Sequence, residues 1–238
     1  FPQARYAAGS AAIILTGALH RTQAREVVDR HFGDWRGAPA PATEFQVEPR
    51  SRETRVFIVH RPGAVQSEIR MGHVGVGRHH EDYFPLLVMN TILGGAFTSR
   101  LNMSLREKHG FTYGARSAFG FRRRPGPFTV NVAVASDVTA RAIEVALDEI
   151  EQLRADGPTA EELDSARDYL RGIMPLKLQT TSQVASRLSE LVVFGLPDDY
   201  FDRTRERIAA VTRDDVHRVA RENVRTDQLA VVVVGDAE

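Results

Sequence analysis

The fold of this chain is decided by the stretch NTILGGAFTSRLNMSLREKHGFTYG, residues 90–114. An apolar stripe predicts a helix over residues 82–93, which a pair of glycines is expected to end. A second helix is predicted over residues 98–108, and Gly110 suits the position after it because glycine tolerates a left-handed backbone. A strand is then expected to begin at Tyr113. The stretch therefore predicts two consecutive helices followed directly by a strand.

Strand patterns lie on both sides of this stretch. Before it, apolar and polar residues predict strands over residues 56–59 and 68–76. After it, residues 113–121 and 128–135 predict a hairpin. Between these two strands lies RRRPGP, residues 122–127, which we interpret as a charged, solvated hairpin tip.

The remainder of the chain is predicted to be mostly helical and to end in a strand. Two Thr-x-x-acid patterns, at residues 159–162 and 212–215, each predict the capped start of a helix. The apolar run LAVVVV predicts a last strand over residues 229–234. The other helices are predicted over residues 138–155, 182–194 and 199–209.

The two ends of the chain echo each other. AAIILT, residues 11–16, predicts a short buried strand, and a helix is predicted after it over residues 20–32. The segment AGSAAIILTGA around this strand aligns with TDQLAVVVVGD near the C-terminus. We interpret the chain as the tail of one repeat, a linker and one complete second repeat.

Composition excludes several classes of protein. Lys plus Arg and Asp plus Glu are equal at 31 each, which argues against a dedicated nucleic-acid binder. The absence of cysteine excludes a disulfide scaffold and thiolate catalysis. No apolar run approaches the roughly 18 residues of a membrane-spanning helix. The chain starts FPQAR without a methionine, and we expect it to be part of a longer protein.

The stretch at residues 90–114 resembles the signature of the C-terminal homology domain of the inverzincins, which are the pitrilysin, insulinase and mitochondrial-processing-peptidase enzymes. The matching pattern is Leu-Gly-Gly, then Ser-Arg-Leu, then Leu-Arg-Glu-Lys-x-Gly-x-x-Tyr. FGDW in the leading segment and VVVVGD near the end fit as well. The resemblance covers essentially the whole chain. It implies an α+β fold, a two-layer sandwich whose mixed or antiparallel sheet has helices packed on one face.

The resemblance also implies where the zinc of these enzymes is held. One half of such an enzyme carries H-x-x-E-H on a helix, and the motif glutamate is the general base. None of the eight histidines of this chain begins that motif. The nearest cluster, at residues 79–82 (HHED), is interpreted as the polar start of a helix, with adventitious metal binding as the alternative. We therefore expect no metal or cofactor in this chain and zinc in the missing or partner half.

Matching positions of the signature imply the residues that contact substrate. Arg106 and Tyr113 are expected to bind a peptide carbonyl and to stabilise the oxyanion. The alternative is that Arg106 is a surface ion-pair partner and Tyr113 a strand aromatic. Gly94, Gly95 and Phe97 are predicted to bind substrate, against a plain helix stop for the glycines and core packing for the ring. The remaining aromatic candidates for the cleft, for which core packing is favoured, are Phe111, Phe119 and Phe121.

These expectations divide the chain into three parts. Residues 1–37 are predicted to be the C-terminal tail of a truncated first homology domain, residues 38–53 a linker, and residues 54–238 a second, metal-free homology domain. The first functional hypothesis is the C-terminal substrate-binding half of a zinc metalloendopeptidase, with a zinc-bearing homologous half and a peptide substrate as partners. The second is a non-catalytic or structural subunit that pairs with a separate zinc-bearing chain. The compartment is not decided by the sequence, and a bacterial cytoplasm or periplasm is the expectation.

Overall fold

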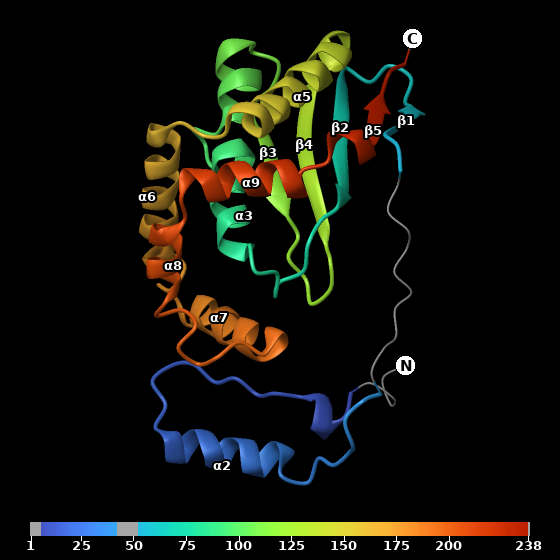
Figure 1. Ribbon diagram of the computed structural model, residues 1–238. Helices are drawn as coiled ribbons and strands as arrows, with labels where there is room; N and C mark the ends of the chain where they lie inside the picture. Colours follow the sequence, from blue (N-terminus) through green and yellow to red (C-terminus); the bar gives the residue numbers. More distant parts are fainter. Residues whose placement is uncertain (1–5, 42–51, 238) are drawn as a thin grey trace. The chain divides into compact units, whose positions relative to one another are not determined.

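The computed structural model describes residues 6–41 and 52–237 (Figure 1). They divide into two compact units. The small unit consists of the described part of residues 1–48 and of Ile173–Tyr200. The sheet unit consists of the described residues from 52 to 172 and from 201 to 237. Among the described residues, every buried apolar side chain except Tyr200 belongs to the sheet unit. The sheet unit therefore contains the hydrophobic core.

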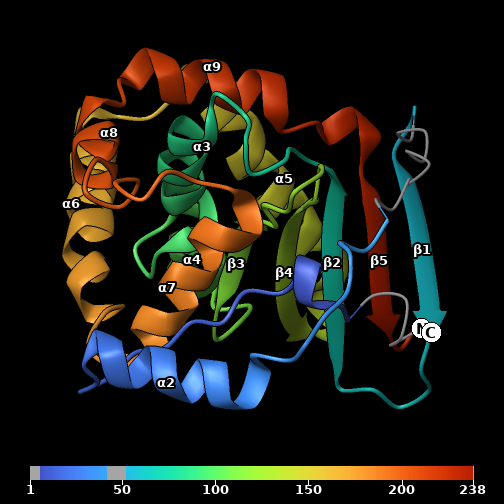
Figure 2. The same ribbon diagram turned by 90° about the horizontal axis from the view of Figure 1, so that it is seen from below.

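The sheet unit is built on a five-stranded mixed sheet. Its strands are β1 (Arg55–His60), β2 (Gln66–Val74), β3 (Ala115–Phe119), β4 (Pro127–Ala135) and β5 (Ala230–Gly235). They lie in the order β1-β5-β2-β4-β3, which can be followed across Figure 2. The pair β1–β5 is parallel, and the other pairs are antiparallel. The hairpin predicted from the alternating pattern is formed by β3 and β4.

One face of this sheet is buried because its side chains alternate along the strands. In β4 the apolar residues at every second position are buried, and the residues between them are not. The neighbouring strands β2 and β5 continue the same buried layer through the register that pairs Ile69 with Val233 and Met71 with Val231. The buried residues of β4 are Phe128, Val130, Val132 and Val134.

Helices cover that face. α5 (Thr139–Asp156) contacts β2 and β4, and α3 (Tyr83–Asn90) contacts β3. α9 (Arg213–Asn223) packs on both helices, and Figure 1 shows α5 and α9 crossing the same side of the sheet. α8 (Thr204–Ala210) contacts α3. The predicted α+β sandwich with helices on one face is confirmed.

Two helix starts follow the predicted capping boxes. The Thr159 amide donates to Glu162 Oε2 at 2.8 Å, and the Glu162 amide donates back to Thr159 Oγ1 at 3.1 Å, at the start of α6 (Ala160–Leu176). Thr212 and Asp215 form the same pair at the start of α9, with bonds of 2.9 and 3.1 Å. Each box satisfies backbone amides that have no partner inside the helix, so these starts could be read from local sequence.

The small unit differs from its prediction. It contains α2 (Arg21–Phe32), close to the predicted helix, and α7 (Thr181–Phe194). The strand predicted at residues 11–16 is wrong, because these residues have no regular secondary structure and Ile13 is 43% exposed. Within residues 6–41 and 173–200 there is no strand with which they could pair. The side chain of Thr16, in this segment, instead donates to the Thr181 carbonyl at 2.9 Å.

Several predicted boundaries also need correction or lie outside the described residues. The strand expected to begin at Tyr113 begins at Ala115. The helix expected from residue 199 begins at Thr204, because residues 198–203 form turns after a proline. Of the predicted linker, residues 42–51 lie outside the described residues. The division into a truncated first domain, a linker and a second domain stays a prediction.

Candidate functional site

Both predicted helices of residues 90–114 end as π-helices. α3 continues into a π-helix over Thr91–Gly95, and the short α4 (Arg100–Asn102) continues into another over Met103–Lys108. π-Helical turns are rare in proteins overall, and those that occur are often found at functional sites. The sequence predicted both helices but carries no signal for this wider hydrogen-bond pattern. Arg106 lies within the second π-helix.

Arg106 is held by two neighbours. Its guanidinium carbon lies 4.6 Å from the centre of the Phe97 ring, within the range of a cation–π contact. Its Nε lies 3.4 Å from a carboxylate oxygen of Glu107. The Arg106 side chain remains 35% exposed, so the ion pair contributes little stability by itself. Two of the predicted site residues, Arg106 and Phe97, are therefore brought into contact, and the guanidinium stays accessible.

Tyr113 lies in the turn between the second π-helix and β3. Gly110 has the positive φ of +66° expected after a helix, and the chain then turns at Thr112, whose Oγ1 accepts from the Gly114 amide at 3.1 Å. The Tyr113 side chain is 93% exposed. In the part of the chain that the structure describes, its hydroxyl has no hydrogen-bond partner. Tyr113 therefore lies outside β3 and is not packed as a strand aromatic would be. Its hydroxyl is open to a ligand.

The glycine pair has a packing reason. A Cβ on the buried Gly94 would lie 2.4 Å from the backbone nitrogen of Ser117, so only glycine lets this turn approach β3 so closely. Gly95 is exposed, and a Cβ there would lie 3.0 Å from the Asn90 side chain. The predicted role of both glycines in binding substrate stays a prediction beside this structural one.

The other aromatic candidates mostly pack on one another. Phe119 is buried and its ring centre lies 4.8 Å from that of Phe128 in the core. Phe121 stacks on Phe119 at 5.6 Å. Phe111 stacks instead on the imidazole of His109, at 5.0 Å. Of the four phenylalanines weighed for the cleft, Phe97 is the one in contact with Arg106.

A family model described as the peptidase M16 inactive domain matches residues 1–170. The chain belongs to the peptidase M16 inactive domain family. A protein of Mycobacterium bovis described as an uncharacterized zinc protease is 30% identical over 197 residues, which are 82% of this chain and 45% of that protein. The chain thus spans about half the length of this M16 relative.

Two further proteins are similar to this chain. The crystal structure of a peptidase M16 inactive domain from Pseudomonas fluorescens has a TM-score of 0.83 and 24% identity, and the match covers 93% of this chain and 53% of that one. A Helicobacter pylori protein named a non-peptidase homolog is 21% identical over 149 residues, which are 63% of this chain and 34% of that protein. The solved structure shows that the M16 inactive domain fold extends over nearly the whole chain.

The part of this M16 domain that the structure describes holds no group of three His, Cys, Asp or Glu side chains that could bind a metal ion. The HHED cluster at residues 79–82 is used locally, because His80 Nδ1 accepts from the Asp82 amide at 3.2 Å just before α3. The described residues therefore do not fit the zinc that the names of the relatives imply. Among the described helices, none combines the length and the apolar character needed to cross a membrane.

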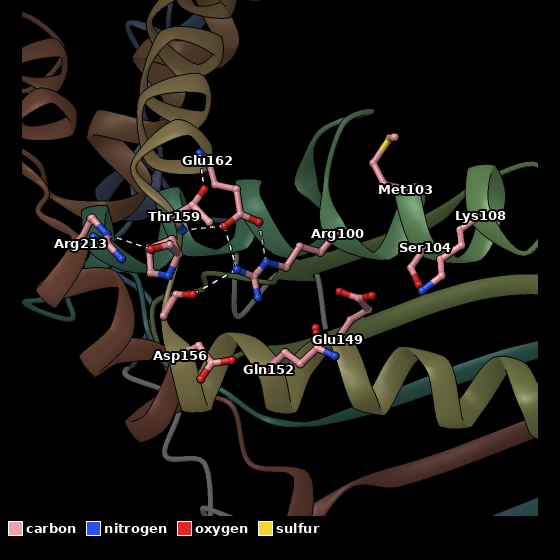
Figure 3. Close-up of a pocket in the computed structure, with 12 residues that line it drawn as sticks. Arg100, Met103, Ser104, Lys108, Glu149, Gln152, Asp156, Thr159, Glu162 and Arg213 are labelled. Carbon is pink, nitrogen blue, oxygen red and sulfur yellow. Dashed lines mark hydrogen bonds and ion pairs between the residues drawn. The ribbon is translucent and has the colours of Figure 1, made fainter.

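A pocket of about 640 Å³ in the M16 domain lies among residues that the sequence did not predict to form a site (Figure 3). Arg100 crosses it to Glu162, with Nε–Oε1 and Nη2–Oε2 distances of 2.6 and 2.7 Å, and also donates to the Gly157 carbonyl at 3.1 Å. Burial acts to raise the pKa of Glu162, but hydrogen bonds from Arg100 and Thr159 outweigh it and leave that pKa below its usual value. The pair joins the start of α4 to the start of α6. It therefore anchors the helical segment that carries Arg106.

Proposed function

We propose that this chain is the C-terminal substrate-binding half of a zinc metalloendopeptidase acting on polypeptides, and that Arg106 and Tyr113 bind the peptide at the scissile bond. The observation that carries the proposal is the Arg106–Phe97 stack, with the guanidinium partly exposed in a π-helix of the family signature. The free hydroxyl of Tyr113 in the following turn supports it.

The two side chains suit the chemistry of peptide hydrolysis. An arginine presents fixed cationic N–H donors, and a tyrosine presents a neutral O–H donor. Both can donate to a peptide carbonyl oxygen, and their bonds strengthen as that oxygen gains negative charge during attack by water. Zinc bound in the other half would supply the activated water and a Lewis acid. The contribution of this chain is then to hold the substrate and stabilise developing charge.

The partner that we propose is a homologous, zinc-bearing half. Its presence is supported by the length of the match, since the chain covers 45% of the Mycobacterium bovis relative. β1 supports it too, because this edge strand leaves its apolar side chains uncovered, and Ile58 is 64% exposed. Exposed apolar edge strands are usually covered by another element in the working protein. We assign the zinc-bearing half as the element that covers β1.

The substitution Tyr113→Phe tests the proposed roles most directly. In the enzyme assembled from this chain and its zinc-bearing half, we expect kcat on a peptide substrate to fall by about 10²–10³-fold, because one preorganised donor is lost. KM should change much less. Tyr169→Phe is the matched control, since Tyr169 is also exposed but lies on α6. Unchanged kcat in Tyr113→Phe, with the protein folded, would exclude the hydroxyl from the reaction.

Metal content provides a second test. We expect the chain alone to retain no stoichiometric zinc after dialysis and to hydrolyse no peptide, since its described residues offer no ligand cluster. Adding the zinc-bearing half should give hydrolysis that a chelator abolishes. One tightly held zinc per isolated chain, measured by elemental analysis, would contradict the assignment.

The second candidate function is a structural subunit that pairs with a separate zinc-bearing chain. The specific observation in its favour is the relative named a non-peptidase homolog. Arg106→Ala separates the two candidates. A structural subunit would support the same turnover with this substitution, whereas the substrate-binding half would lose turnover and substrate affinity together.

A further inference from the structure

We propose that Asn102 is a positioning residue that sets the placement of both Arg106 and Tyr113. The Asn102 side chain is buried, with 4% of its surface exposed, and lies at the end of α4, just before the π-helix that carries Arg106. Its Nδ2 donates to the Phe97 carbonyl at 2.6 Å, and its Oδ1 accepts from the Ala115 amide at 3.2 Å. One side-chain amide therefore joins the two loops on either side of the helix.

The first bond acts on Arg106 through Phe97. Phe97 is 60% exposed, and its ring lies against the Arg106 guanidinium. A hydrogen bond to its own carbonyl holds the backbone from which this ring projects. Since the cation–π contact depends on where the ring lies, the Asn102–Phe97 bond limits the positions open to the guanidinium.

The second bond acts on Tyr113 through the start of β3. Ala115 is the first residue of that edge strand and lies two residues after Tyr113. Its amide bonds to the Asn102 side chain across 13 residues of chain, which fixes one end of the turn that displays Tyr113. The other end begins at Gly110, whose amide donates to the Arg106 carbonyl at 3.0 Å. Loss of this bond frees the turn without removing any group that could touch substrate.

Burial makes both bonds necessary. A buried amide has donors and an acceptor that are costly to leave without partners, so the side chain and the two loops hold one another in a single arrangement. The proposal rests on the proposed function, because it matters for turnover only if Arg106 and Tyr113 contact substrate. In that case Asn102 affects the transition state through their placement, and loss of about 1 Å of precision is enough to slow the reaction.

Asn90 provides a matched control. Its amide likewise makes two bonds to β3, accepting from Ser117 Oγ at 2.8 Å and donating to the Ser117 carbonyl at 3.1 Å. Neither bond reaches the loop of Phe97 or the turn of Tyr113. A residue that only supports β3 should behave as Asn90 does, and a positioning residue should not.

The experiment combines hydrogen exchange with kinetics in the enzyme assembled from this chain and its zinc-bearing half. In Asn102→Ala we expect the Ala115 amide to exchange at least about tenfold faster, because its acceptor is gone. We expect kcat to fall by about 10–10²-fold with little change in KM. Asn102→Asp keeps an acceptor for Ala115 but places a carboxylate oxygen against the Phe97 carbonyl, so it should preserve slow exchange at Ala115 and still lower kcat. Asn90→Ala should leave both kcat and the Ala115 exchange rate near their original values.

The outcomes separate this proposal from the function on which it rests. If Tyr113→Phe lowers kcat and Asn102→Ala does not, the positioning role is overturned and the proposed function stands. If neither substitution lowers kcat, the positioning role and the proposed function are both overturned. An equal loss of kcat in Asn90→Ala and Asn102→Ala would also overturn the positioning role, since general support of β3 would explain it. Should Asn102→Ala fail to fold, Asn102→Asp decides by the same comparison.

Discussion

Residues 11–16 and β5 have nearly the same apolar pattern and opposite structures. AAIILT in the small unit has no regular secondary structure, and Leu15 is 43% exposed. AVVVVG of β5 lies between β1 and β2 and pairs with both, and Val231 is 3% exposed. A strand bonds to neighbouring strands and not to itself, so an apolar run becomes a strand only where partners are present. The contrast shows that strand formation here depends on what else the unit contains.

The largest expected effect concerns the exchange of backbone amides. We expect amides of β5 to open only with global unfolding, which costs about 5–15 kcal/mol in typical domains, so they should exchange at least about 10³-fold more slowly than those of residues 11–16. Hydrogen exchange of the chain alone, followed by mass spectrometry or NMR, measures both. If the zinc-bearing half supplies partner strands, its addition should slow exchange at residues 11–16. Strong protection there in the chain alone would end the contrast between the two regions.

Charged substitutions should separate the two regions by a smaller amount. Val231→Asp places a carboxylate opposite Val56 and Met71 in the sheet, in surroundings that cannot solvate it. We expect the free energy of unfolding to fall by about 4 kcal/mol or more, measured by denaturant titration. Ile13→Asp is the matched substitution in the small unit and should change it by less than about 0.5 kcal/mol. Equal losses in the two variants would mean that residues 11–16 are packed as firmly as β5.

The smallest expected effect compares two ion pairs. Arg218 on α9 donates to Oδ2 of Asp82, the residue just before α3, at 3.0 Å. The Asp82 side chain is 11% exposed. The hydrogen bond from Arg218 lowers the pKa of Asp82. In the small unit, Arg25 and Asp29 form an exposed pair within α2. We expect Asp82→Asn to lower the free energy of unfolding by about 1–3 kcal/mol, and Asp29→Asn to lower it by no more than about 0.5 kcal/mol.

The pH dependence of the Asp82 pair follows from the sign of its shift. Because folding lowers the pKa of Asp82, the stability it contributes is fully present above the usual aspartate pKa of about 3.9 and is lost as the pH falls through the lower, folded value. Denaturant titrations between pH 6 and acid should therefore show part of the stability disappearing in the wild type but not in Asp82→Asn. The same acid dependence in both proteins would assign it to other carboxylates.

Much of the candidate site was open to prediction, but not its geometry. The signature pattern predicted that Arg106 and Tyr113 contact substrate, and Phe97 was predicted separately as a substrate-binding residue. It could not indicate that Phe97 lies against the Arg106 guanidinium, because that contact depends on a π-helical turn. Asn102 was missed because a single asparagine in a predicted helix has no distinctive pattern. The available signal was its place between Leu101 and Leu105 of that predicted helix.

The sequence alone determined what depends on near neighbours. Alternating valines gave the buried face of β4, and Thr-x-x-acid patterns gave two helix starts, because these signals act over two to four residues. The missing H-x-x-E-H motif was equally a matter of local spacing. Tertiary structure decided that residues 11–16 find no strand partner among the described residues, that Gly94 must leave room for β3, and that Asn102 joins two loops. Each of these depends on groups far apart in the chain, whose approach is set by tertiary packing rather than by local preference.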